Sequence, residues 1–172
     1  MKKTLITILA TVLICCLAVG GTLAWLTAST ESIENTFTVG DINITLEESP
    51  NLDLMIVPGT TITKDPVVTV DGGSEACWLF VKIEKANWSD KLTYSLDGWT
   101  ELPGETDVFY RSVLYSDNDQ KFHVIAGDII TVSQDLAKGE LTAAPVMTLT
   151  AYAVQSEGVA DAATAWGHLP TT

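Results

Sequence analysis

Short runs rich in valine, isoleucine, threonine and aromatic residues recur along the chain, separated by clusters of glycine, proline, aspartate and asparagine. In the clearest run, residues 77–85, every second residue from Cys77 to Ile83 is apolar, whereas Lys82 and Glu84 fall on the opposite face. A period of two is the side-chain repeat of a β-strand. The pattern predicts a mostly β fold, in which only one face of this strand meets the core at its later end.

Eight further runs are predicted as strands: 36–46, 54–57, 66–70, 92–96, 108–115, 121–125, 128–133 and 145–155. Nine strands favour an all-β, two-layer antiparallel sandwich. Residues 133–144 lack the alternation and are predicted as a loop. Residues 159–169 carry strong helix formers and predict a short C-terminal helix that packs Trp166 on the sandwich.

The N-terminal segment has the pattern of an export signal. Lys2 and Lys3 precede an uncharged, mostly apolar run, and Thr22 and Ala24 supply the small side chains that a signal peptidase requires. We expect cleavage after Ala24, so that the mature chain begins at Trp25 and is secreted to the cell surface or the extracellular matrix. The alternative is an uncleaved signal, which would be the chain's one membrane contact, since about 20 apolar residues span a bilayer.

Cleavage would leave 148 of the 172 residues and a single cysteine, Cys77, so no disulfide could form within the body. The whole chain holds 9 basic against 22 acidic residues, and loss of Lys2 and Lys3 takes its net charge from −13 to −15. Such a charge repels phosphate backbones and anionic lipid, which excludes nucleic acid as a partner.

Five segments together resemble the TasA/camelysin family of Gram-positive bacteria. They are residues 20–27, 35–44, 57–66, 77–83 and 151–155. The resemblance implies export through a SipW-type signal peptidase, a jelly-roll body and a structural role in biofilm-matrix fibres. It divides the chain into a signal peptide at 1–24, an N-terminal segment at 25–35 and a sandwich domain at 36–172.

The N-terminal segment is a candidate donor strand. It is polar, lacks proline and glycine, and precedes the first predicted strand. An extended segment of this kind can add a strand to another subunit, either a second copy or a related fibre protein. The predicted donor runs from Trp25 to Phe37. Its large apolar residues are Trp25, Leu26, Ile33 and Phe37, of which Trp25 and Ile33 are the better anchors. The alternative is a loose tail left by cleavage.

Catalysis is not predicted. Camelysin-type proteins have been described as metallopeptidases, but this chain lacks His-Glu-x-x-His, and its two histidines, His123 and His168, have no helical zinc-ligand spacing. Cys77 alternates with Leu79 and Val81 as a core residue does, which disfavours a nucleophile paired with His123. We therefore expect no catalytic residue, no metal ligand set and no cofactor.

Calcium is a weak candidate ligand. Asp117 and Asp119 flank Asn118 in a predicted turn, which matches a fragment of a calcium loop, and a solvated turn is the simpler interpretation. Residues 47–53 form a second acidic loop with the same two interpretations. Divalent cations would also screen the repulsion between bodies of this charge, which makes calcium-dependent assembly a secondary hypothesis.

Aromatic residues suggest a different class of function. Trp78, Trp88, Tyr94 and Trp99 lie in or beside predicted strands, and flat rings stack on saccharides. A carbohydrate-binding module or cell-surface adhesin is therefore the alternative to a fibre subunit. Ordinary packing in the core or at a sheet edge explains each ring as well.

Overall fold

A computed structural model describes residues 41–50, 55–137 and 139–169, all within the compact unit Val39–Thr172. The regular secondary structure of the described residues is almost entirely β, as predicted. The strands are β1 (Ile44–Glu47), β2 (Thr61–Thr63), β3 (Val67–Val70), β4 (Cys77–Ala86), β5 (Leu92–Thr93), β6 (Thr100–Glu101), β7 (Val108–Val113), β8 (Gln120–His123), β9 (Ile129–Val132) and β10 (Val146–Gln155); a 3₁₀ turn, η1 (Ala126–Asp128), and an α-helix, α2 (Ala162–Gly167), complete the set.

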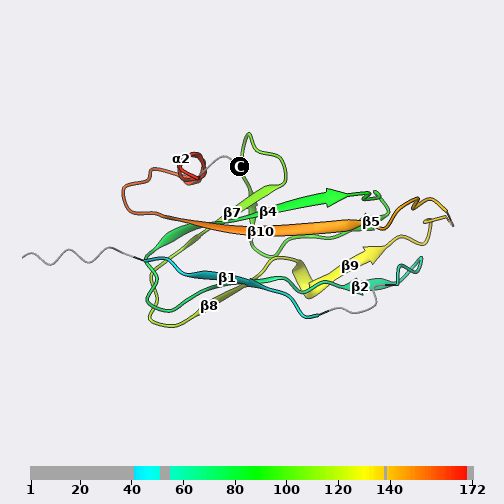
Figure 1. Cartoon of the computed structure of the whole chain (residues 1–172), viewed down its shortest axis with the longest axis horizontal. Coiled ribbons are helices and arrows are strands. Elements are labelled where there is room, and N and C mark those ends of the chain that lie inside the picture. The colour runs from blue at the N-terminus through cyan, green and yellow to red at the C-terminus, as the bar shows by residue number, and fades with distance from the viewer. Residues whose placement is uncertain (1–40, 51–54, 138, 170–172) are drawn as a thin grey trace, which may run out of the picture. The chain divides into compact units, whose positions relative to one another are not determined.

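These strands form three antiparallel sheets in two layers (Figure 1). One layer is the four-stranded sheet β10-β4-β7-β6. The other contains β1-β3-β8 and, further along, β2-β9-β5, because β2 leads into β3 and β8 leads into β9. The predicted sandwich is confirmed, while its jelly-roll topology stays a prediction.

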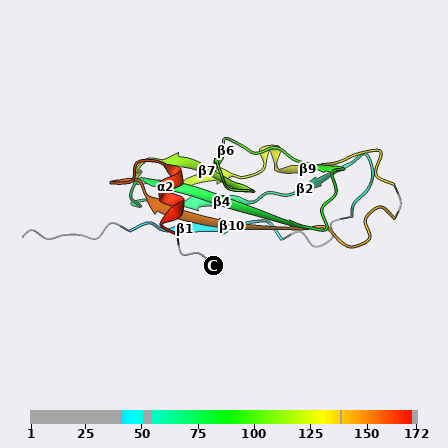
Figure 2. The same ribbon diagram turned by 90° about the horizontal axis from the view of Figure 1, so that it is seen from above.

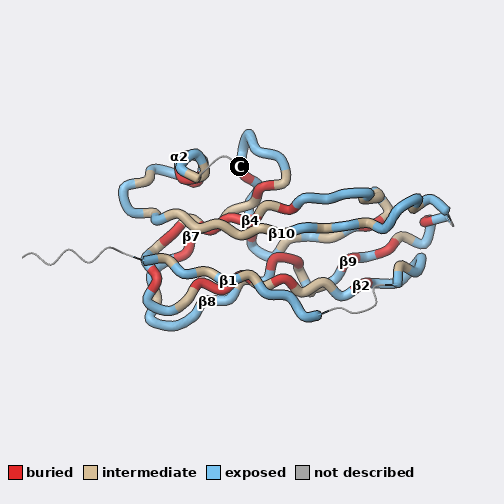
Figure 3. The backbone as a smooth tube through the Cα atoms, in the orientation of Figure 1, coloured by how far each residue is buried: buried red, intermediate tan, exposed pale blue. Residues whose placement is uncertain are grey.

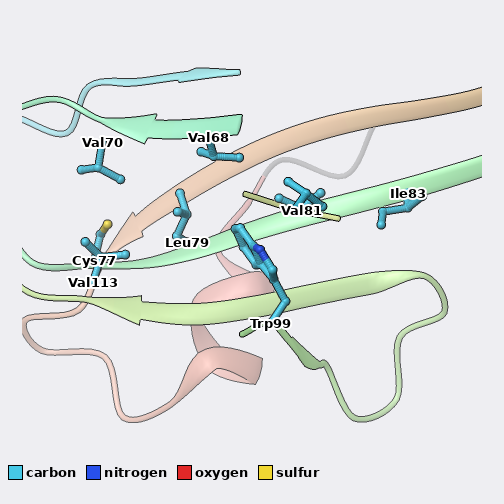
Figure 4. Packing of buried hydrophobic residues seen from close by; sticks show 9 residues of the cluster. Val68, Val70, Cys77, Leu79, Val81, Ile83, Trp99 and Val113 are labelled. Carbon is cyan, nitrogen blue, oxygen red and sulfur yellow. The ribbon is translucent and has the colours of Figure 1, made fainter. Parts of the chain in front are cut away.

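Strand β4 is central to the packing. Its inner residues Cys77, Leu79, Val81 and Ile83 are completely buried, and Figure 4 shows them beside Val68 and Val70 of β3, between the two layers. Burial of one such side chain contributes about 1.5–3 kcal/mol. The period-two interpretation of this strand is confirmed.

The opposite face of β4 is covered over half of its length. Phe80 is fully buried beneath α2, which lies across the sheet (Figure 2). The ring of Trp166 on α2 lies 5.3 Å from that of Phe80 and 5.4 Å from that of Tyr152, so the predicted C-terminal helix and its tryptophan contact are confirmed. At the later end Lys82 and Glu84 form an ion pair of 3.1 Å outside the core.

The first turn of α2 is closed by a side-chain cap. Asp161 accepts a hydrogen bond of 2.8 Å from the backbone N–H of Thr164, and this bond lowers the pKa of the Asp161 carboxyl. The helix has six residues, and no helix in the described part of the chain is long and apolar enough to cross a membrane.

The strand predictions need correction at several points. Residues 55–57 of the predicted strand 54–57 form no strand; Met55 is 79% exposed, and the Val57 carbonyl instead accepts the Thr60 hydroxyl across a turn at Pro58 and Gly59. Two short strands, β2 and β6, were not predicted. The first predicted strand begins only at Ile44 among the described residues, and its positions 36–40 lie outside them. The predicted loop at 133–144 is confirmed over its described residues.

Candidate functional site

One side of the sandwich is bounded by two edge strands. Strands β1 and β10 stand at the ends of their sheets and contact each other across the two layers. In the described part of the chain no strand pairs with the outer edge of either. β10 has ten residues, so a long row of backbone N–H and C=O groups faces outward, which is the template that a further strand pairs with.

The interior of this side is apolar and only half covered. Four core-facing residues of β10, Met147, Leu149, Ala151 and Ala153, lie opposite Lys85, Ile83, Val81 and Leu79 of β4. They pack against the main cluster together with Ile44 and Leu46 of β1, yet no residue of β1 or β10 is buried (Figure 3). We call this surface, formed by β1 and β10, the open side.

The other side of the sandwich is closed by the chain itself. Residues 95–99 run along the backbone of 123–126: Ala126 N–H donates to the Ser95 carbonyl at 2.9 Å, and Asp97 N–H donates to the Val124 carbonyl at 3.1 Å. The indole N–H of the buried Trp99 donates to the His123 carbonyl at 2.8 Å. We call this surface, formed by residues 95–99 and 123–126, the closed side. The open side presents strand edges to a partner, whereas the closed side is covered by the chain's own residues.

Arg111 was not anticipated from the sequence. It lies on the core-facing side of β7, opposite Leu79, with its guanidinium 4.1 Å from the ring centre of Phe122 and 5.4 Å from that of Trp99. Burial lowers its pKa, and the carboxylate of Asp97 partly opposes that shift. Two aromatic faces thus hold a cation at the closed side. The sequence signal that could have placed Arg111 on the core-facing side was its alternation with Phe109 and Val113 along the strand.

The residues predicted for export and strand donation lie outside the described residues. These are the cleavage position at Ala24 and Trp25 and the donor residues Leu26, Ile33 and Phe37. Their roles stay predictions.

The two histidines lie on different layers of the sandwich and do not form a shared site. His123 is exposed on the outer face of the sheet β1-β3-β8, where its Nδ1 lies 2.8 Å from a carboxylate oxygen of Asp128. His168 is exposed at the end of α2, which covers the outer face of the other layer. One metal ion cannot contact both. Among the described residues, no three His, Cys, Asp or Glu side chains gather as a metal site would need.

Cys77 lies in the core, where burial raises the pKa of its thiol to about 11. A high pKa suppresses the thiolate, which is the reactive form of cysteine. His123 faces away from the core, so it does not activate this thiol.

This buried thiol predicts a loss of stability at high pH. In the unfolded chain the thiol ionises near pH 9.0, whereas in the folded protein it ionises near pH 11. As the pH rises from 9 to 11, ionisation therefore favours the unfolded state. We expect the free energy of unfolding of the chain beginning at Trp25 to fall more steeply over this range than that of its Cys77→Ala variant, measured by urea denaturation. Parallel pH profiles for the two proteins would contradict the prediction.

The carboxylates of the acidic turn at residues 117–119 accept hydrogen bonds from neighbouring residues. Asp119 accepts a hydrogen bond of 2.9 Å from the backbone N–H of Gly72, and Asp117 accepts one of 2.8 Å from the hydroxyl of Tyr115. The second bond raises the pKa of the Tyr115 hydroxyl. The bond from Gly72, together with one of 2.8 Å from the Gly73 N–H to the Ser116 carbonyl, fastens the turn to the 71–74 loop.

The four aromatic candidates have different surroundings. Trp78 packs edge-on against Tyr110 at 5.9 Å, and Trp99 is buried at the closed side. Tyr94 makes an edge contact of 6.1 Å with Trp88. Trp88 lines a polar cavity between the loop after β4 and the segment before β10, and Tyr94 lines a second cavity beside Thr131.

Residues 1–85, about half of the chain, match the model of a family described as camelysin metallo-endopeptidase. The match confirms the resemblance to the TasA/camelysin family over this part of the sequence. Both histidines of the chain lie beyond residue 85. Comparison with curated proteins gives no match, and comparison with solved structures gives none.

Proposed function

We propose that the protein is a secreted, non-enzymatic subunit of extracellular biofilm-matrix fibres. After a SipW-type signal peptidase cuts behind Ala24, residues 25–37 of one copy pair with the open side of the next copy or of a related subunit. The observation that carries the proposal is the open side itself, where two edge strands border a half-covered apolar interior.

The lengths of the proposed donor segment and of the accepting strand edge agree. The proposed donor has 13 residues, and the ten-residue edge of β10 offers a partner of nearly the same length. Added backbone hydrogen bonds would supply affinity, while Trp25, Ile33 and Phe37 would cover apolar side chains that the subunit alone leaves half exposed. Because the donated segment and the open side are different surfaces, the contact is heterologous and leads to an open filament.

Charge opposes this assembly. Each mature subunit carries a net charge of −15, so neighbouring subunits repel each other unless counterions screen them. As a secondary hypothesis, calcium promotes assembly by screening the acidic surface generally, with Asp117 and Asp119 as weak candidate ligands.

Electron microscopy of two purified forms tests the proposal. One form begins at Trp25 and the other at Thr36, and both are incubated at neutral pH with and without calcium. We expect filaments from the longer form alone, and more of them with calcium. The shorter form keeps the whole predicted sandwich domain, residues 36–172, so it serves as the matched control. Folded monomers from both forms under all conditions would contradict self-assembly.

A further inference from the structure

A polar cavity of about 370 Å³ lies at the end of the sandwich where β4 ends and β10 begins. Four of its residues, Asn87, Trp88, Ser89 and Asp90, follow β4, while Glu140 and Thr142 precede β10. Its volume is at the lower end of the range for small-ligand pockets, about 300–1,000 Å³. That size suits one or two sugar rings.

The walls of this cavity are held by bonds between and within the two loops. The side-chain amide of Asn87 donates to the Ala144 carbonyl at 3.3 Å and so joins one loop to the other. The indole N–H of Trp88 donates to the Leu92 carbonyl at 3.0 Å, and the edge contact with Tyr94 further fixes the ring. Trp88 is therefore a preorganised aromatic surface with its own polar atom already satisfied.

The cavity has more hydrogen-bond acceptors than donors. Glu140 accepts the backbone N–H of Ala137 at 2.9 Å through one carboxylate oxygen, which leaves the other oxygen available. From the described residues, Asp90 accepts only a long bond of 3.5 Å, from the hydroxyl of Ser89. Neither carboxylate pairs with a cation from the described residues. A ligand that fits here must bring donors, and a positive charge favours it.

We propose that this cavity binds an amino-sugar unit of a polysaccharide. The apolar face of the sugar ring packs on Trp88, and its ammonium and hydroxyl groups donate to Asp90 and Glu140. An acidic sugar is repelled by these two carboxylates and by the net charge of the body. A bound calcium ion needs six to eight oxygen ligands, and no group of three candidate metal-ligating side chains occurs in the described part. The proposal does not depend on fibre formation.

Calorimetric titration of the full chain tests this assignment. The probes are a β-1,4-linked glucosamine tetramer, its N-acetylated counterpart, a galacturonic acid tetramer and calcium chloride. We expect the glucosamine tetramer to bind more tightly than the N-acetylated tetramer and the acidic tetramer not to bind. Asp90→Asn and Glu140→Gln keep the shape of each side chain, and each is expected to weaken binding of the glucosamine tetramer at least about tenfold.

Asp135→Asn is the matched control, because it removes the same charge from an exposed residue that does not line the cavity. Its affinity should stay within about twofold of the unchanged protein. Equal weakening by Asp135→Asn would show general charge attraction and overturn the site. Absence of binding at millimolar glucosamine tetramer, equal binding of the N-acetylated tetramer, or stoichiometric calcium binding that competes with the sugar would each overturn the proposal as well.

Discussion

Replacing Phe80 with alanine is expected to lower the free energy of unfolding by about 3–5 kcal/mol. Phe80 is fully buried, and its ring lies 5.3 Å from that of Trp166 and 6.4 Å from that of Tyr110. The substitution removes the centre of the cluster that joins α2 to the sheet, so a cavity remains. Since domains are stable by about 5–15 kcal/mol in total, this loss is a large share of the whole.

Urea denaturation of the chain beginning at Trp25 measures this effect. Phe80→Leu, which retains most of the apolar volume, is the control and should cost clearly less than Phe80→Ala. A loss below about 1 kcal/mol for Phe80→Ala, in the range of ordinary surface changes, would mean that the contact between α2 and the sheet contributes little.

Placing a lysine at Ala151 is expected to abolish filaments while the subunit stays folded. Ala151 faces the half-covered interior of the open side, opposite Val81. An ammonium group there, able to extend from the edge into water, would meet the apolar residues of an incoming strand, and inward-pointing charges are one way in which proteins prevent pairing at sheet edges. The form beginning at Trp25 is compared with and without this change by electron microscopy and sedimentation.

Thr148→Lys is the matched control for this experiment. It adds the same charge to the same strand, but on its outer face and opposite Glu84, where the lysine gains a favourable neighbour. Filaments should persist in this variant. If Ala151→Lys also assembled normally, with circular dichroism confirming a folded subunit, the open side would not be the accepting surface.

Strands were predicted most reliably from the sequence where the apolar period of two was long. Every second residue from Cys77 to Ile83 is apolar, and β4 forms there. β2 was missed because its three residues contain a single apolar side chain, Ile62, too few to define a period. The apolar residues 55–57 misled for the opposite reason, since their side chains precede a turn and Met55 stays in solvent.

The sequence did not predict which side of the sandwich is open and which is closed. Alternation assigns residues to faces of a strand, but it does not say which strand ends a sheet or what covers that edge. Trp99 closes one edge through a bond to a carbonyl 24 residues further along the chain, and Arg111 enters the interior beside two rings. Both depend on pairing between distant segments, which one sequence does not reveal.

The register of β4 also has a consequence for the order of folding. Its first residue, Cys77, pairs with Gln155, and its last, Ala86, pairs with Val146. Synthesis must therefore continue for about 60 residues beyond β4 before pairing between β4 and β10 can begin, and contacts so distant in sequence slow folding because a long loop must close first. We expect β10 to join last. The strand that leaves one edge free in the finished subunit would then be the strand whose arrival completes the sheet.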